Sequence, residues 1–100
     1  MGPSGFEELL ATLSTDFDRS AGWLDAAVKH ADLADLARVS HMVISLAATL
    51  AAHDLAEQAR DTETASNAGS LDAASLGSAL LAEVRALAEE LRDARSRHPA

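Results

Sequence analysis

Apolar side chains recur at steps of three, four or seven residues in three parts of the chain, which places them on one face of an α-helix. These parts run from Ser4 to Ala31, from Asp32 to Ala51 and from Leu71 to Arg97. Their apolar stripes consist of Phe6, Leu10, Leu13, Phe17, Leu24 and Val28, then Leu33, Leu36, Val43, Ala47 and Leu50, and finally Leu76, Leu80, Val84, Leu87 and Leu91. Each stripe predicts an amphipathic helix that buries one side against other helices.

The polar residues that flank these stripes predict where the helices begin and end. Ser4, Asp32 and Ser70 each stand directly before a stripe and have side chains that are favoured as helix N-caps. Gly69 is typical of a helix stop, because glycine adopts the left-handed conformation that follows many helices. The predicted connections are therefore short.

Two further segments complete the expected fold. A third helix from Asp54 to Asn67 has Leu55 as its only large apolar residue. In the first helix, Gly22 costs about 1 kcal/mol relative to alanine, and Ser14–Asp16 could cap a new start. A break there would produce a short extra N-terminal helix. Because amphipathic helices on short connections pack as antiparallel neighbours, we expect one all-α domain over residues 1–100, an antiparallel up-down four-helix bundle.

Composition narrows the functional classes. The chain has 100 residues and a formal charge of -8, which makes nucleic acid and anionic membranes poor partners. No apolar run reaches the roughly 18 residues of a membrane span, and no basic and apolar signal sequence stands at the start. The absence of cysteine excludes disulfides and thiolate metal sites and is compatible with a reducing compartment. We expect a cytoplasmic protein.

Most active-site patterns are missing from the sequence. There is no glycine-rich phosphate loop, no nucleophile elbow and no basic strip interleaved with aromatic residues. The histidines at positions 30, 41, 53 and 98 are too far apart in sequence for a helical metal site, which needs a spacing of three or four. We therefore expect no enzyme activity of its own, no metal site and no cofactor.

His41 is the candidate functional residue. On a helical wheel it falls at the border of the second stripe, near the middle of its helix. Its neighbours within two turns are Ala34, Ala37, Arg38, Ile44, Ser45 and Ala48. Because most of these are small, we expect the imidazole to stand above a low surface that another protein can approach. A neutral imidazole is a competent phosphoryl acceptor, and phosphoryl transfer needs mainly positioning and charge stabilisation.

The segment from residue 41 to 52, His-Met-Val-Ile-Ser-Leu-Ala-Ala-Thr-Leu-Ala-Ala, resembles the phosphoacceptor helix of the histidine phosphotransfer domains of multistep bacterial phosphorelays. That family's signature is a histidine followed by any residue, Leu, Lys, Gly and then Ser or Ala, with a Leu-Gly pair further on. Phe17–Asp32 resembles the preceding helix, Asp54–Ala59 the next, and the residues around Gly69 the last turn.

The resemblance implies a phosphoryl carrier. His41 would pass the group between aspartates of response-regulator receiver domains or take it from a hybrid histidine kinase. Such domains have no ATP site, and the partner receiver supplies the Mg²⁺. The partner surface would comprise the residues around His41, namely Ala34, Ala37, Arg38, Met42, Ile44, Ser45 and Ala48.

Three positions depart from the family pattern. Ile44 replaces the usual lysine, Ser45 replaces the usual glycine, and Leu50-Ala51 replaces the Leu-Gly pair, so the helix can run on there. Arg38, one turn before His41, could supply the missing charge.

Two alternatives follow from these departures and from the length of the chain. The first is a degenerate phosphotransfer fold that binds a receiver or kinase without accepting phosphate. The second is a secreted helical hairpin of the WxG type, but Trp23 is followed by Leu24-Asp25, which lacks that motif.

Overall fold

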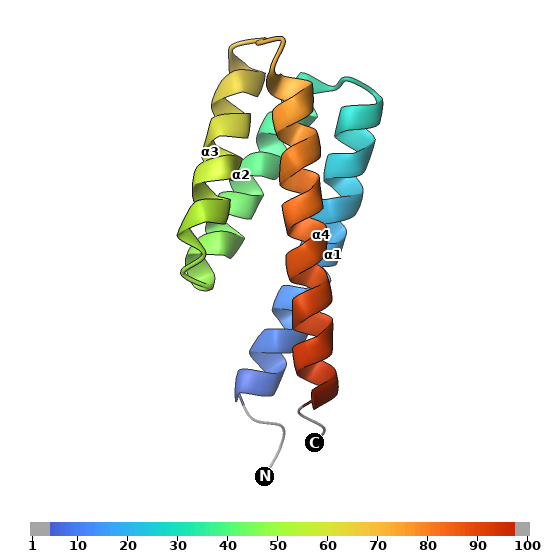
Figure 1. Cartoon of the computed structure of the whole chain (residues 1–100), viewed down its shortest axis with the longest axis vertical. Helices are drawn as coiled ribbons and strands as arrows, with labels where there is room; N and C mark the ends of the chain where they lie inside the picture. The colour runs from blue at the N-terminus through green and yellow to red at the C-terminus, as the bar shows by residue number, and fades with distance from the viewer. Residues whose placement is uncertain (1–4, 98–100) are drawn as a thin grey trace.

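The computed structural model describes residues 5–97, which form four α-helices. These are α1 (Gly5–Lys29), α2 (Leu33–Thr49), α3 (His53–Asn67) and α4 (Ala73–Arg97). Each runs antiparallel to the next along the chain, and the most extensive contacts join α1 to α4 and α2 to α3 (Figure 1). The prediction of an all-α, antiparallel up-down four-helix bundle is confirmed.

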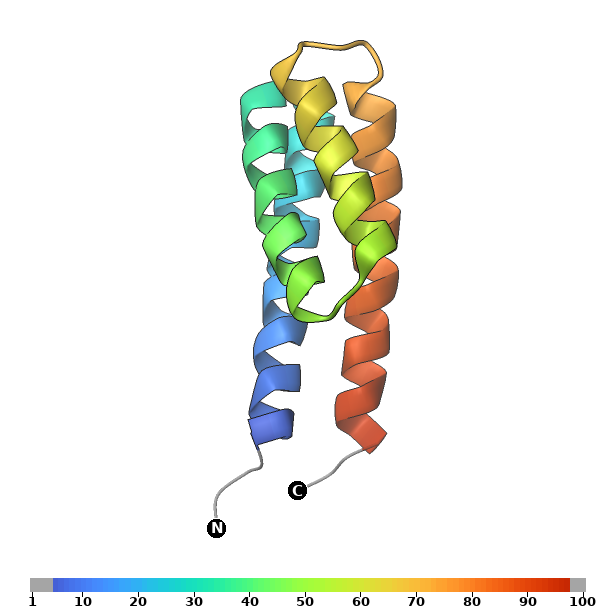
Figure 2. The same cartoon turned by 90° about the vertical axis from the view of Figure 1, so that its left-hand side faces the viewer.

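The bundle has two long and two short helices. The start of α1 and the end of α4 extend together past the turn that joins α2 to α3 (Figures 1 and 2). The molecule is consequently elongated, with extents of 51 × 22 × 17 Å. None of the helices within residues 5–97 is long and apolar enough to cross a bilayer.

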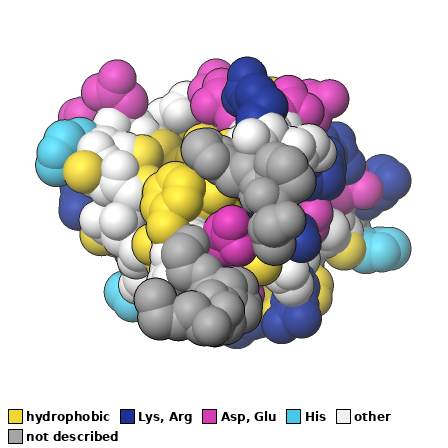
Figure 3. Space-filling view, turned by 90° about the horizontal axis from the view of Figure 1, so that it is seen from below, with side chains coloured by type: hydrophobic (Ala, Val, Ile, Leu, Met, Phe, Trp, Pro, Cys, Tyr) yellow, Lys and Arg dark blue, Asp and Glu magenta, His cyan; other side chains and the backbone are white. Residues whose placement is uncertain are grey.

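The end of the bundle that consists of α1 and α4 alone explains one wrong expectation. Phe6 was predicted to be buried with the first stripe, yet it is 56% exposed, and Leu9 is 45% exposed. Apolar side chains are visible at this end of the bundle when it is seen along its axis (Figure 3). Only α4 lies beside α1 there, so α2 and α3 cannot cover the far side of the first turns.

The core fills the space between all four helices. Its largest fully buried apolar side chains are Phe17, Leu24, Leu36, Val39, Val43, Leu80 and Val84. All except Val39 belong to the predicted stripes. Each contributes roughly 1.5–3 kcal/mol when it is removed from water, so the stripes account for most of the driving force for packing.

The first three helices end in the same backbone motif. Ala31, Ala51 and Gly69 follow the helices with φ of 50°, 54° and 65°, in the left-handed region. The next amide then donates to a carbonyl five residues earlier at 2.9 Å: Asp32 to Ala27, Ala52 to Ala47, and Ser70 to Ala65. The predicted stop at Gly69 is confirmed. The expectation that α2 can run on through residue 51 is wrong, because alanine adopts the glycine-like conformation there.

The start of α2 agrees with the sequence. Asp32 is the N-cap of α2, and its Oδ1 accepts a hydrogen bond from the amide of Asp35 at 3.0 Å. The predicted cap Ser4 lies outside the described residues. α1 continues without a break through Gly22, so the suggested extra N-terminal helix does not form.

The last helix begins two residues later than predicted. The Oγ atom of Ser70 accepts a hydrogen bond from the amide of Asp72 at 3.1 Å, and this contact orders a turn. α4 therefore starts at Ala73, and Leu71 lies in the turn, fully exposed. α3 starts at His53, one residue earlier than expected.

Candidate functional site

His41 lies near the middle of α2 with its side chain 69% exposed. Its Nδ1 atom is 3.0 Å from Oε2 of Glu63, which projects from the neighbouring helix α3 and is 26% exposed. The antiparallel packing of α2 against α3 brings these residues together although they are 22 positions apart in sequence. The imidazole is therefore held on one side and open on the other.

This contact has a chemical consequence for the ring. A carboxylate only accepts hydrogen bonds, so of the two neutral tautomers of the imidazole it selects the one with the proton on Nδ1. The lone pair then resides on Nε2. Within residues 5–97, Nε2 has no hydrogen-bonding or ionic partner. The accessible nitrogen is thus the nucleophilic one.

Two hollows flank His41. The α1–α2 hollow, of about 330 Å³, is lined by His41 together with Asp16, Arg19, Ser20, Trp23, Met42, Ser45 and Leu46. The α2–α3 hollow, of about 500 Å³, is lined by His41 together with Ala34, Ala37, Arg38, Met42, Glu63 and Asn67. His41 and Met42 form the ridge between them. The surface around the imidazole is accordingly low on both sides.

Arg38 is held one turn before His41. Its Nε and Nη2 atoms lie 2.9 and 2.7 Å from Oδ1 of Asp35, and Nη1 lies 3.6 Å from Sδ of Met42. Its Cζ atom is 5.7 Å from the centre of the Trp23 ring on α1, within the range of a cation–π interaction. The guanidinium is therefore positioned by three neighbours rather than extended freely into solvent.

The structure separates the predicted partner surface into accessible and covered residues. Ala34, Arg38, Ser45 and Ala48 are exposed, and Met42 is half-buried. Ala37, by contrast, is only 7% exposed and forms the floor of the α2–α3 hollow. Ala37 therefore offers little accessible surface to a partner, because it lies on the side of α2 that faces α3.

Ile44 lies at the edge of the apolar stripe of α2. It is half-buried and packs against the core, next to the buried Val43. A branched apolar side chain at the border of the stripe gains more from contact with the core than from exposure. Ile44 therefore belongs to the packing of α2 and contributes little accessible surface near His41.

Two residues that line the hollows beside His41, Glu63 and Trp23, are not among the site residues that the sequence predicts. α3 is polar on most of its surface, so no pattern distinguishes Glu63 from the other acidic residues of that helix. Trp23 is 36% exposed at the side of the α1–α2 hollow. The spacing of Asp35 and Arg38, three residues apart on one helix, is a signal that would have predicted their ion pair.

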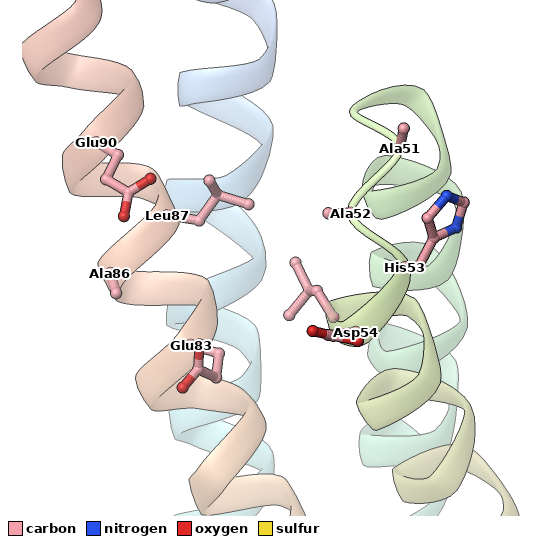
Figure 4. Close-up of a pocket in the computed structure, with 9 residues that line it drawn as sticks. Ala51, Ala52, His53, Asp54, Glu83, Ala86, Leu87 and Glu90 are labelled. Atoms are coloured by element: carbon pink, nitrogen blue, oxygen red, sulfur yellow. The ribbon is translucent and has the colours of Figure 1, made fainter.

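A further hollow of about 480 Å³ lies between the start of α3 and α4. Asp54 points toward it, as Figure 4 shows, and Glu83 and Glu90 line its other side, whereas the ring of His53 points away. Three carboxylates there would repel a phosphoryl group, so this hollow is a poorer candidate than the surroundings of His41.

Within residues 5–97 no three histidine or acidic side chains are grouped so that they could hold a metal ion.

Comparison with known proteins gives no family assignment: no protein-family model matches the chain, and neither does any curated protein or solved structure.

Proposed function

We propose that this protein is a histidine phosphotransfer domain that carries a phosphoryl group on Nε2 of His41 in a cytoplasmic two-component phosphorelay. The observation that supports this most strongly is the exposed imidazole whose Nδ1 lies 3.0 Å from the carboxylate of Glu63. The four-helix bundle and the resemblance of the segment from residue 41 to 52 to the family's phosphoacceptor helix agree with the proposal.

The proposed chemistry needs only one nucleophile from this chain. The lone pair of Nε2 attacks the phosphorus of an aspartyl phosphate on a receiver domain. The bond between phosphorus and the aspartate oxygen breaks, and the carboxylate leaves with the electron pair. Transfer to a second receiver reverses these steps, and the receivers supply Mg²⁺, so no cofactor is bound by the bundle itself.

Glu63 is the positioning residue in this proposal. Attack by Nε2 leaves a positive charge on the ring, with the proton of Nδ1 facing the carboxylate of Glu63. That charge is stabilised by a fixed anion that needs no rearrangement during the reaction. Glu63 also restricts rotation of the ring, which keeps Nε2 directed toward an approaching receiver.

Arg38 supplies positive charge near the phosphoryl group. The family's lysine is replaced by Ile44, which packs against the core and has no charge. Arg38 lies one helical turn from His41 and is exposed, so its guanidinium can reach oxygens of a group on Nε2. A surface charge of this kind contributes roughly 0.2–1 kcal/mol, enough for a rate effect of a few-fold.

Labelled phosphoryl transfer tests the proposal. Phosphorylated receiver domains from a broad panel are incubated with the wild-type protein and with His41→Gln. We expect label to leave at least one receiver and to appear, in acid-labile and base-stable form, on the wild-type protein and on His30→Gln but not on His41→Gln. The matched control is His30→Gln, because His30 is also exposed but lies at the end of α1.

Binding without phosphorylation is the second candidate function. Two observations favour it: Ile44 stands where the family has its lysine, and Glu63 places a negative charge beside His41. A module of this kind would bind a receiver or kinase equally well with and without His41, and no receiver would lose label to it.

A further inference from the structure

The surroundings of Arg38 suggest how the site changes when it is phosphorylated. In the free protein its guanidinium contacts Asp35, the sulfur atom of Met42 and the indole of Trp23. Both ion-pair partners are substantially exposed, with 55% of the Arg38 side chain and 33% of the Asp35 side chain accessible. Exposed ion pairs and exposed cation–π contacts are weak, because water and salt screen them. Arg38 is therefore held in place but easily displaced.

A phosphoryl group on His41 would compete strongly for Arg38. It has a charge of about −1.5 to −2 and three acceptor oxygens, against the single charge of Asp35. A guanidinium can donate two parallel hydrogen bonds to it, which is the strongest arrangement open to arginine. His41 and Arg38 are three residues apart on α2, so both side chains leave the same face of the helix.

We infer that phosphorylation of His41 draws Arg38 from Asp35 and Trp23 to the phosphoryl group and uncovers the indole at the side of the α1–α2 hollow. This inference rests on the proposed function, since it requires a phosphoryl group at His41. Its consequence is that the free and phosphorylated proteins present different surfaces beside the same histidine. A partner that contacts Trp23 then distinguishes the two forms.

Arg19 is a second source of positive charge near His41, because it lines the α1–α2 hollow together with His41 and Trp23. It projects from α1 and is exposed, and within residues 5–97 it has no ion-pair partner. It makes no cation–π contact with Trp23 among the described residues. Arg19 is therefore a matched control: its removal takes away a positive charge near His41 without uncovering Trp23.

Trp23 is the only tryptophan of the chain, so its fluorescence reports on this hollow alone. Phosphoramidate serves as the chemical phosphoryl donor: Nε2 attacks phosphorus, the phosphorus–nitrogen bond breaks, and ammonia leaves with the electron pair. Phosphorus NMR establishes whether His41 is modified. Acrylamide quenching and the emission maximum of Trp23 are then measured before and after modification in wild type, His41→Gln, Arg38→Gln and Arg19→Gln.

We expect phosphorylation to raise the quenching constant of wild type to the value that unphosphorylated Arg38→Gln shows. The emission maximum of wild type should shift to longer wavelength at the same time. Arg38→Gln should not change further, Arg19→Gln should respond like wild type, and His41→Gln should not respond. A phosphorylated His41 with unchanged Trp23 fluorescence overturns the inference alone, as does a response that disappears in Arg19→Gln. Absence of phosphorus from His41 contradicts the proposed function and the inference together.

Discussion

The Nδ1 atom of His41 on α2 lies 3.0 Å from the Oε2 atom of Glu63 on α3, the helix that packs most extensively against α2. The sequence alone identifies His41 as a candidate functional residue, whereas it does not distinguish Glu63 from other acidic residues. Because Glu63 is half-buried while His41 is exposed, the carboxylate is the fixed member and the imidazole is the accessible one.

The first prediction concerns Glu63. Glu63→Ala should lower the rate of phosphoryl transfer to His41 by roughly tenfold, by analogy with the lower end of the loss seen when the hydrogen-bond partner of a metal-ligating histidine is removed. Glu63→Gln keeps an oxygen acceptor without the charge and should recover part of the rate. Single-turnover transfer kinetics measure both. Equal rates in Glu63→Ala and wild type would show that Glu63 does not position the ring.

The second prediction concerns the helix ends. Ala31 and Ala51 adopt left-handed backbone conformations, which cost an alanine about 1–2 kcal/mol and a glycine almost nothing. Ala51→Gly should therefore raise the free energy of unfolding by about 0.5–1 kcal/mol, after the greater flexibility of glycine in the unfolded chain is subtracted. Urea denaturation followed by circular dichroism measures the change.

The control for this prediction is Ala82→Gly, at an exposed interior position of α4. It should lower the free energy of unfolding by about 1 kcal/mol, because glycine is unfavourable inside a helix. If Ala51→Gly and Ala82→Gly destabilise the protein equally, residue 51 is not in the left-handed conformation.

The third prediction separates packing from partner contact at Ile44. Ile44 packs against the core, so Ile44→Lys should lower the free energy of unfolding by roughly 1–3 kcal/mol, although it restores the family's lysine. Ser45→Lys, at the exposed neighbouring position, should change it by no more than about 0.5 kcal/mol. Thermal denaturation compares the two. A stable Ile44→Lys would mean that the residue 44 side chain can leave the core freely.

The fourth prediction concerns the low surface next to His41. Ser45 and Ala48 are exposed and small, and both lie within two turns of His41 on α2. Ser45→Tyr and Ala48→Trp should each reduce transfer strongly, because a bulky side chain there blocks the approach of a receiver. Stability should change by no more than about 0.5 kcal/mol, as at other surface positions. Ala79→Tyr, exposed on α4, should leave transfer unchanged. Equal transfer in all three variants would exclude docking on this face.

Much of the fold follows from local features of the sequence. The stripes of α1, α2 and α4 predict the buried sides of those helices, and Asp32 and Gly69 predict a start and a stop, since each has an intrinsic preference for that position. The stops at residues 31 and 51 could not be predicted in this way. Alanine has no preference for the left-handed conformation, and only the packing of the next helix imposes it.

The candidate site was predictable only in part. The position of His41 on its helix and its small neighbours are properties of one helix, and a helical wheel suffices to infer them. The contact of His41 with Glu63 and the contact of Arg38 with Trp23 depend on how α2 packs against α3 and α1. The sequence of α2 alone does not encode that packing. The burial of Ala37 could not be predicted for the same reason, since a helical wheel does not show which neighbouring helix covers a small residue at the border.

The central claim is that Nε2 of His41 carries the phosphoryl group, and heteronuclear NMR tests it most directly. The protein is labelled with ¹⁵N at its histidines, incubated with a phosphorylated receiver that transfers label, and examined for coupling between ³¹P and ¹⁵N. We expect a single phosphorus-coupled nitrogen, Nε2 of His41, with the Nδ1 of the same ring still protonated beside Glu63. Phosphorus on Nδ1, on another histidine, or on no histidine would contradict it.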